Sequence, residues 1–196
     1  MHLDWEYEVN RLELVKQAIE RELRIRKRKK EEYKKQMQVI NKDMWEEVGA
    51  LSGFSSIDEI PTFIQDINML KQNLLSASEN NKRIKMLERL LYSPYFCRID
   101  FKEDNSDTES FYIGVYGFRK GDTGEILIYD WRAPVSSMFY DYEPGRASYK
   151  SPSGYIEGEL TLKRQYRIEN GQLLLMFDSA IPIEDEILQE ILASNT

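Results

Sequence analysis

The sequence is poor in the residues that most often carry catalysis and metal binding. Its 196 residues include a single cysteine, Cys97, and a single histidine, His2. One cysteine cannot close a disulfide within the chain, and no cluster of cysteine and histidine is present to bind a metal. A catalytic triad or dyad that uses His2, near the start of the chain, is not expected. We therefore predict no catalytic residue, no bound metal and no bound cofactor in this stretch of chain.

Long hydrophobic runs and targeting patterns are also missing. No stretch of about 18 apolar residues occurs, and the first residues, MHLDWEYEVNRLELV, lack the pattern of a signal peptide. The phosphate-binding pattern GxxxxGK[ST] is absent, so this chain holds no nucleotide in a P-loop. We expect a soluble, cytoplasmic protein without membrane contact.

The charge is unevenly spread along the chain. The net charge is −7, but residues 1–91 carry 17 basic and 16 acidic side chains, whereas residues 92–196 carry 10 basic and 18 acidic ones. Neither half has the strong positive charge that is typical of a general nucleic-acid binder.

Glycine and proline are absent between Trp5 and Val48, which indicates one long helix. At 1.5 Å per residue, such a helix is roughly 65 Å long. Its apolar residues recur in steps of three and four, provided that polar residues occupy some of the positions in the series. This spacing is typical of the seam of a coiled coil. The predicted seam residues are Trp5, Val9, Leu12, Ile19, Leu23, Tyr33, Met37, Ile40, Met44 and Val48.

A second helix is predicted after a break at Gly49, Gly53 and Pro61. Ser56 and Glu59 have the spacing of a capping box, and Pro61 suits a first helical turn. The helix is expected to end before Pro94, and its predicted seam comprises Ile64, Ile67, Leu70, Leu74, Ala77, Ile84, Leu87 and Leu91. Two seams joined by a short turn favour an antiparallel hairpin, although a coiled coil between two chains has the same pattern.

Beyond Pro94 the hydrophobic period changes to two, as in β-strands. The predicted strands are YFCRIDF, SFYIGVYGF, EILIYDW, SSMFYDY, ASYK and the two halves of YIEGELTLKRQYRIENGQLLLMF, where Asn170-Gly171 predicts a hairpin turn. A final helix is predicted over 181–196. The fold class is therefore α+β, with a coiled-coil arm over 1–91, a small, mostly antiparallel β domain over 92–180 and a C-terminal linker helix.

Three groups of residues are candidates for binding or structural roles. The run from Arg21 to Lys35 carries nine basic residues against three acidic ones. It either contacts phosphates or an acidic protein surface, or forms a solvated helix face, as such runs more often do. The residues chosen from it as partner-binding candidates are Arg24, Arg26, Lys27, Arg28, Lys29 and Lys30.

Asp58 and Glu59 are the second group, at the predicted tip of the hairpin. A carboxylate pair there either binds Mg²⁺ or contacts a partner, or it caps the second helix. The capping role is the more common one.

The stretch DWRAP is the third group. Asp130 and Arg132 lie two apart on an extended chain and can pair, Trp131 offers a ring, and Pro134 ends the strand. We interpret Asp130, Trp131, Arg132 and Pro134 as a structural corner. A glycosidase-like pair of Asp130 and Asp141 has no other support.

Longer strings from residue 94 onward resemble one known family. PYFCRIDF, YIGVYGF, LIYDWRAPVSSMFYDYEPGRASYKSPSGYIEGELTLKRQ and FDSAIPIEDEILQEILASNT together resemble the N-terminal region of HelD-type proteins. These are UvrD-like, superfamily-one helicase relatives that associate with bacterial RNA polymerase. The resemblance covers roughly 90–196, and the helical hairpin agrees with it in architecture only.

The resemblance implies a non-catalytic arm that binds the RNA polymerase core. Similar arms insert a helical hairpin into the secondary channel, as Gre-type factors do, and support release of polymerase from nucleic acid and its recycling. On this view the tip acids point to the catalytic centre, the basic run lies along the channel, and DWRAP holds the hairpin to the β domain. ATP and Mg²⁺ then belong to motor domains of the parent protein, beyond Thr196. The alternative is a nucleic-acid-binding accessory domain of a DNA helicase that uses the basic helix face.

Overall fold

Two long helices precede the strands, as the sequence predicts. The computed structural model describes residues 2–50, 60–104 and 106–178. The first helix, α1, spans His2–Ala50, and the second, α2, spans Ile60–Tyr92. Pro61 lies in the first turn of α2, and α2 ends before Pro94. Gly49 does not break α1, which continues through it to Ala50.

The chain divides into two compact units, which are described separately. The sheet unit comprises residues 1–19 and 90–196, and the helical unit comprises residues 20–89. These limits differ from the predicted boundary at 91/92, because the first part of α1 belongs to the same unit as the sheet. The predicted helix over 181–196 lies outside the described residues.

A mostly antiparallel sheet dominates the sheet unit, which confirms the α+β class. In the described residues its path runs β3-β4-β2-β1-β6-β5, and β7 pairs with β6. The pair β2–β4 is parallel, and the other pairs are antiparallel. The strands are β1 (Cys97–Glu103), β2 (Thr108–Gly114), β3 (Phe118–Arg119), β4 (Ile126–Asp130), β5 (Gly145–Ser151), β6 (Gly154–Glu169) and β7 (Gln172–Asp178).

The hairpin turn at Asn170-Gly171 is confirmed. It joins β6 to β7, and both turn residues have positive φ, 52° for Asn170 and 67° for Gly171. This is the conformation that a type I′ turn requires and that asparagine and glycine adopt most readily. The Gly171 N–H also donates to the carbonyl oxygen of Tyr92, at 2.9 Å, which links the turn to the end of α2.

The strand predicted for SSMFYDY is wrong. The segment forms a 3₁₀ turn, η2 (Pro134–Ser136), followed by the short helix α3 (Ser137–Asp141). Pro134 occupies the first turn of this helical segment, where its missing N–H costs nothing. Val135 and Met138 are buried three residues apart, and Phe139 and Tyr142 pack beside the same core. That spacing is helical rather than alternating.

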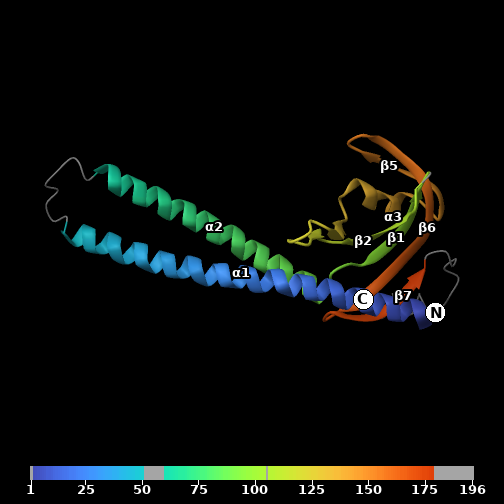
Figure 1. Cartoon of the computed structure of the whole chain (residues 1–196), viewed down its shortest axis with the longest axis horizontal. Coiled ribbons are helices and arrows are strands. Elements are labelled where there is room, and N and C mark those ends of the chain that lie inside the picture. The colour runs from blue at the N-terminus through green and yellow to red at the C-terminus, as the bar shows by residue number, and fades with distance from the viewer. Residues whose placement is uncertain (1, 51–59, 105, 179–196) are drawn as a thin grey trace, which may run out of the picture. The chain divides into compact units, whose positions relative to one another are not determined.

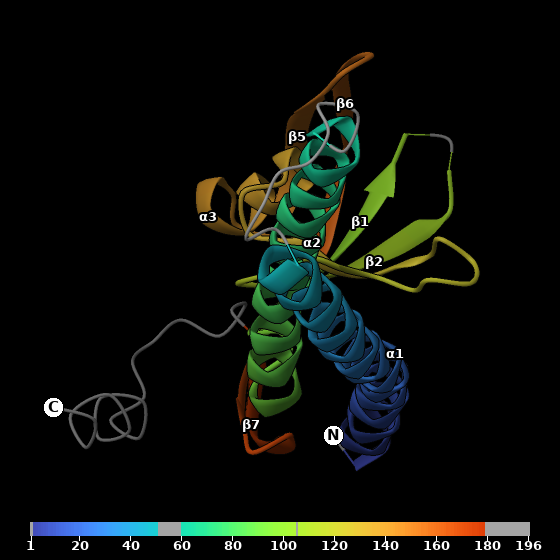
Figure 2. The same ribbon diagram turned by 90° about the vertical axis from the view of Figure 1, so that its left-hand side faces the viewer.

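The core of the sheet unit lies on the face of the sheet that η2 and α3 cover. Cys97, Ile99 and Phe101 of β1 alternate onto this face, where Val135 and Met138 meet them. Both views show α3 beside the strands (Figures 1 and 2). Cys97 is fully buried, and burial raises the pKa of its thiol. The core residues are Cys97, Ile99, Phe101, Phe111, Ile113, Val135, Met138, Ala147 and Leu160.

In the helical unit, α1 and α2 run side by side in opposite directions (Figure 1). The Asn80 side-chain amide donates to the Arg26 carbonyl oxygen at 2.9 Å, and the Lys27 Nζ lies 3.2 Å from a carboxylate oxygen of Glu88. Within the described residues, no helix is both long and apolar enough to cross a membrane.

The predicted seams differ from the buried stripes in several positions. In α1, Trp5 and Val9 are exposed, and the buried residues there are Glu8, Leu12, Val15, Ile19 and Leu23. In α2, Ile64, Ile67 and Leu74 are exposed, and the buried residues that were missed are Asn80 and Leu90. One regular heptad of buried or half-buried positions runs along α2: Leu70, Asn73, Ala77, Asn80, Ile84, Leu87 and Leu91.

Candidate interaction surface and the buried ionic cluster

The predicted partner-binding residues lie together on one stretch of α1. Arg24, Lys27, Arg28, Lys29 and Lys30 are exposed, and only Arg26 is half-buried. Since α1 turns by 100° per residue, the six basic positions, 24 and 26–30, point in every direction around the helix. They form a collar of positive charge rather than a single basic face.

Two residues of this collar are held in ion pairs. The Arg26 Nε lies 2.6 Å from a carboxylate oxygen of Glu22 one turn earlier, and Lys27 pairs with Glu88 on α2. Neither pair is deeply buried, so each is worth about 0–1 kcal/mol. Within the described residues, Arg24, Arg28, Lys29 and Lys30 form no ion pair and remain available to a partner.

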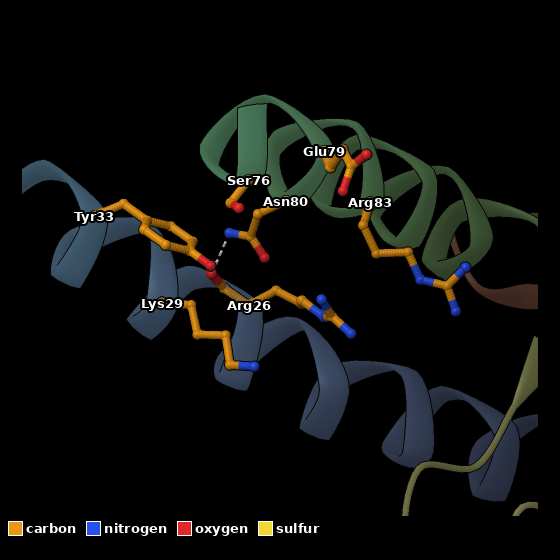
Figure 3. Close-up of a pocket in the computed structure, with 7 residues that line it drawn as sticks. All are labelled: Arg26, Lys29, Tyr33, Ser76, Glu79, Asn80 and Arg83. Atoms are coloured by element: carbon orange, nitrogen blue, oxygen red, sulfur yellow. Dashed lines mark hydrogen bonds between the residues drawn. The ribbon is translucent and has the colours of Figure 1, made fainter. Parts of the chain in front are cut away.

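Two hollows between the helices border the collar. One, of about 320 Å³, is lined by Arg26, Lys29, Tyr33, Ser76, Glu79, Asn80 and Arg83, as Figure 3 shows. The other, of about 650 Å³, is lined by Lys27, Lys30, Glu31, Asn81, Ile84, Lys85 and Glu88. Both hollows are lined mainly by polar and charged residues and contain more than one cation, which favours charged groups as occupants.

Asn80 is a polar residue of the seam and lines the smaller hollow. Only 5% of its surface is exposed, and it donates across to the backbone of α1. A buried asparagine at a seam position favours the one register in which its hydrogen bond is made, at some cost in stability. Asn80 therefore fixes how the described parts of the two helices align.

Apolar side chains are also exposed on the helical unit. They lie mainly between residues 64 and 75 of α2, beyond the part of the seam that is buried. Exposed apolar groups next to exposed cations are typical of protein-binding surfaces more than of phosphate-binding ones. These residues are Ile25 and Val39 of α1 and Ile64, Ile67, Met69, Leu74 and Leu75 of α2.

The predicted tip residues, Asp58 and Glu59, lie outside the described residues. Their roles in capping, in metal binding or in partner contact stay predictions. Within the described residues, no group of three or more histidine, cysteine, aspartate or glutamate side chains could hold a metal ion.

The DWRAP stretch forms a tight corner at the end of β4. The Arg132 guanidinium donates to both carboxylate oxygens of Asp130, at 2.8 Å each, and the Arg132 backbone N–H donates to one of them at 2.9 Å. The Asp130 carbonyl oxygen accepts from the Ser136 hydroxyl and from the Ala133 N–H. These bonds turn the chain from β4 into η2, while the Trp131 side chain stays 48% exposed.

The Arg132 side chain also controls the charge of Asp130. Its hydrogen bonds hold the pKa of the Asp130 carboxyl at about 2, below its usual range, against a smaller opposing effect of burial. The carboxylate is therefore ionised at neutral pH and saturated with donors. A group in this state is a poor general acid, which agrees with a structural corner rather than a catalytic one.

Sequence reasoning missed the charged side chain that is most deeply buried among the described residues. Glu8 of α1 is 1% exposed, and one of its carboxylate oxygens accepts from Arg98 at 2.7 Å and from Arg164 at 3.3 Å. The other accepts from the Tyr112 hydroxyl at 3.0 Å. Glu8 thus links α1 to β1, β2 and β6 within the sheet unit. The signal was present, because Glu8 begins the stripe that Leu12, Val15 and Ile19 continue.

Each arginine of this cluster has a second acidic partner. Arg98 pairs through both carboxylate oxygens of Asp100, at 2.7 Å each, and Arg164 pairs through both oxygens of Asp178. Burial opposes the charge of Arg98, but the hydrogen bonds that it donates to Asp100 and Glu8 outweigh this effect and raise the pKa of its guanidinium. Burial raises the pKa of the neighbouring Tyr112 hydroxyl. The cluster positions α1 on the sheet.

The described residues form a paired-helix unit and a sheet unit with a tight corner at DWRAP. A family model described as "DNA helicase IV HelD, N-terminal domain" matches residues 5–191. The chain belongs to this family of helicase N-terminal domains. A search of the curated proteins finds no match.

Proposed function

We propose that this chain is the polymerase-binding arm of a HelD-like helicase and acts through a coiled-coil hairpin formed by α1 and α2. The hairpin enters the secondary channel of bacterial RNA polymerase and supports release of the enzyme from nucleic acid. ATP and Mg²⁺ are used by the motor domains of the parent protein. The single observation that carries the proposal is the family match over residues 5–191.

The composition of the helical unit supports a protein partner. Four collar cations, Arg24, Arg28, Lys29 and Lys30, are without ion pairs in the described residues, and apolar side chains are exposed over 64–75 of α2. A channel wall made of protein offers both acidic and apolar contacts. A nucleic-acid backbone offers only the former, because phosphate recognition uses charge and hydrogen bonds.

The test is binding of the chain to purified core RNA polymerase. We expect capture of core polymerase by the immobilised chain and displacement of the chain by a Gre-type factor in excess. A chain that captures polymerase but is not displaced binds elsewhere, which would contradict insertion into the channel. Failure to capture polymerase at all would remove the proposal.

A pair of matched variants locates the contact. Replacing Arg24, Arg28, Lys29 and Lys30 together by glutamine removes four positive charges from the helical unit. Replacing Lys102, Arg119, Lys120 and Lys150 removes the same charge from the sheet unit. We expect the first variant to lose at least tenfold in affinity for polymerase and the second to lose less than threefold.

Direct DNA binding is a second candidate, favoured by the hollow that Lys27, Lys30 and Lys85 line. If the collar contacts many phosphates, affinity for duplex DNA falls by several powers of ten over a fourfold rise in salt. A titration of fluorescent DNA at low salt decides this. Absence of binding there removes the candidate without affecting the polymerase proposal.

A further inference from the structure

The smaller hollow between α1 and α2 has the features of a binding site for a small molecule. Its volume of about 320 Å³ lies at the lower end of the range for small-molecule sites, roughly 300–1,000 Å³. All of its lining residues belong to the helical unit, and Figure 3 shows Tyr33 at one end, Asn80 in the middle and Arg83 at the other end. Of the residues that line this hollow, only Lys29 is also one of the exposed collar residues that the proposed polymerase contact uses.

Positive charge exceeds negative charge around this hollow. Arg26, Lys29 and Arg83 line it against one carboxylate, that of Glu79, and the nearby Glu22 pairs with Arg26. One positive charge is left uncompensated. Burial and the nearby Arg26 lower the pKa of the Arg83 guanidinium, and Glu22 offsets this only in part. An anion placed between the two guanidinium groups would relieve their repulsion.

A buried acceptor in the hollow also lacks a donor. Asn80 Nδ2 donates to the Arg26 carbonyl oxygen, but Asn80 Oδ1 is buried and has no hydrogen-bond partner among the described residues. Buried polar atoms without partners are rare in folded proteins, so one that faces a cationic hollow marks an incomplete site. A hydroxyl group of a ligand, or a guanidinium N–H drawn inward by a bound anion, would supply the missing donor.

The aromatic ring of Tyr33 adds a flat, half-buried surface at the end of the hollow. Tyrosine rings bind nucleobases by stacking, and they do so with any base because every base has a π-face. We infer that the hollow binds a small phosphate monoester that carries hydroxyl groups and a flat base, that is, a nucleoside monophosphate. The phosphate pairs with Arg26 and Arg83, and the base stacks on Tyr33.

Calorimetric titration of the whole chain with AMP at low salt tests the inference. We expect saturable binding of one AMP per chain. Inorganic phosphate lacks the base and sugar, and adenosine lacks the phosphate, so each should bind at least tenfold more weakly than AMP. No heat of binding up to millimolar AMP would overturn the inference. Equal affinities for AMP and inorganic phosphate would also overturn it.

Variants of matched charge show whether the hollow is the site. Arg83→Gln is expected to weaken AMP binding at least tenfold, with partial recovery in Arg83→Lys, and Tyr33→Leu is expected to weaken AMP but not inorganic phosphate. Lys34→Gln removes the same charge from an exposed position that does not line the hollow, and should change affinity less than twofold. Equal losses in Arg83→Gln and Lys34→Gln would contradict a defined site.

The same experiment includes two controls, one for folding and one for the class of ligand. Helical content by circular dichroism is expected to be unchanged in all four variants. Tighter binding of a short polyaspartate peptide than of AMP would overturn the inference, because it would mark the hollow as a contact for an acidic protein segment. Arg83→Gln should still capture core polymerase, so a failure of AMP binding can be told apart from a failure of the proposed function.

Discussion

The sheet unit and the helical unit are stabilised in different ways. The sheet unit has a deep apolar core on one face and, around Glu8, a buried cluster in which every charge has a partner. The helical unit has a thin seam, interrupted by Asn80, and exposes both cations and apolar side chains. The difference indicates that the sheet unit is built for stability, whereas the surface of the helical unit is left available for binding.

The largest expected effect is on the sheet unit, through Glu8. Glu8→Leu leaves the guanidinium groups of Arg98 and Arg164 buried without their shared partner, so we expect a loss of about 3–5 kcal/mol in the free energy of unfolding. Chemical denaturation followed by tryptophan fluorescence measures it. Glu6→Gln, at an exposed position of the same helix, is the control and should change stability by less than about 0.5 kcal/mol. Equal stability of Glu8→Leu and the native chain would contradict the anchoring role of the cluster.

A smaller effect is expected in the seam of the helical unit. Leu87 is fully buried, so Leu87→Ala should cost about 2–4 kcal/mol in the stability of that unit. Leu75→Ala makes the same change at an exposed position of α2 and should cost less than about 0.5 kcal/mol. Hydrogen exchange of α2 amides reports on this unit alone. Similar losses in the two variants would mean that the two helices are not held by the buried stripe.

Asn80 should affect specificity more than stability. Asn80→Leu removes the hydrogen bond to Arg26 but adds apolar contact, so we expect a change of no more than about 1 kcal/mol in unfolding free energy. We expect the variant to lose the unique register of its two helices. Light scattering after size-exclusion chromatography would then detect mixed oligomers. A variant that remains as homogeneous as the native chain would show that other contacts fix the register.

The smallest expected effect is at the corner of β4 and η2. Because the pKa of Asp130 is about 2 in the folded chain and near 3.8 otherwise, its pairing contributes stability above about pH 4 that is lost as pH falls through 2. Since Arg132 is exposed, Arg132→Gln should cost less than about 1 kcal/mol at pH 7 and almost nothing at pH 2. Carbon-13 NMR should show the Asp130 pKa moving toward 3.8. If the Asp130 carboxyl of the variant still titrates near 2, the backbone N–H donors alone are enough to lower its pKa.

Much of the fold follows from local sequence patterns. The two helices, the β class of the second half and the turn at Asn170-Gly171 are all predicted, because each depends on periodicity or on backbone preferences of neighbouring residues. SSMFYDY was misread as a strand although Val135, Met138, Phe139 and Tyr142 have helical spacing. The helical period of its apolar residues was hard to recognise because the segment is short and contains several serines and tyrosines.

The site was less predictable than the fold. The collar cations could be named because they form one run of the sequence, and the Asp130–Arg132 pair because its two members lie two residues apart. Glu8, in contrast, meets Arg98 and Arg164, which lie 90 and 156 residues away along the chain. Asn80 and Arg83 likewise meet Arg26 only through the pairing of the helices. Contacts between residues so far apart depend on strand order and helix register, which single-sequence patterns do not specify.

Site-specific photo-crosslinking to core RNA polymerase tests the central claim most directly. A photoreactive amino acid is placed at Lys30 in the helical unit or at Lys150 in the sheet unit, both of them exposed lysines. The account predicts cross-links from position 30 to the walls of the secondary channel, suppressed by a Gre-type factor, and few or none to those walls from position 150. Cross-links to the channel from position 150 alone, or from neither position, would contradict it.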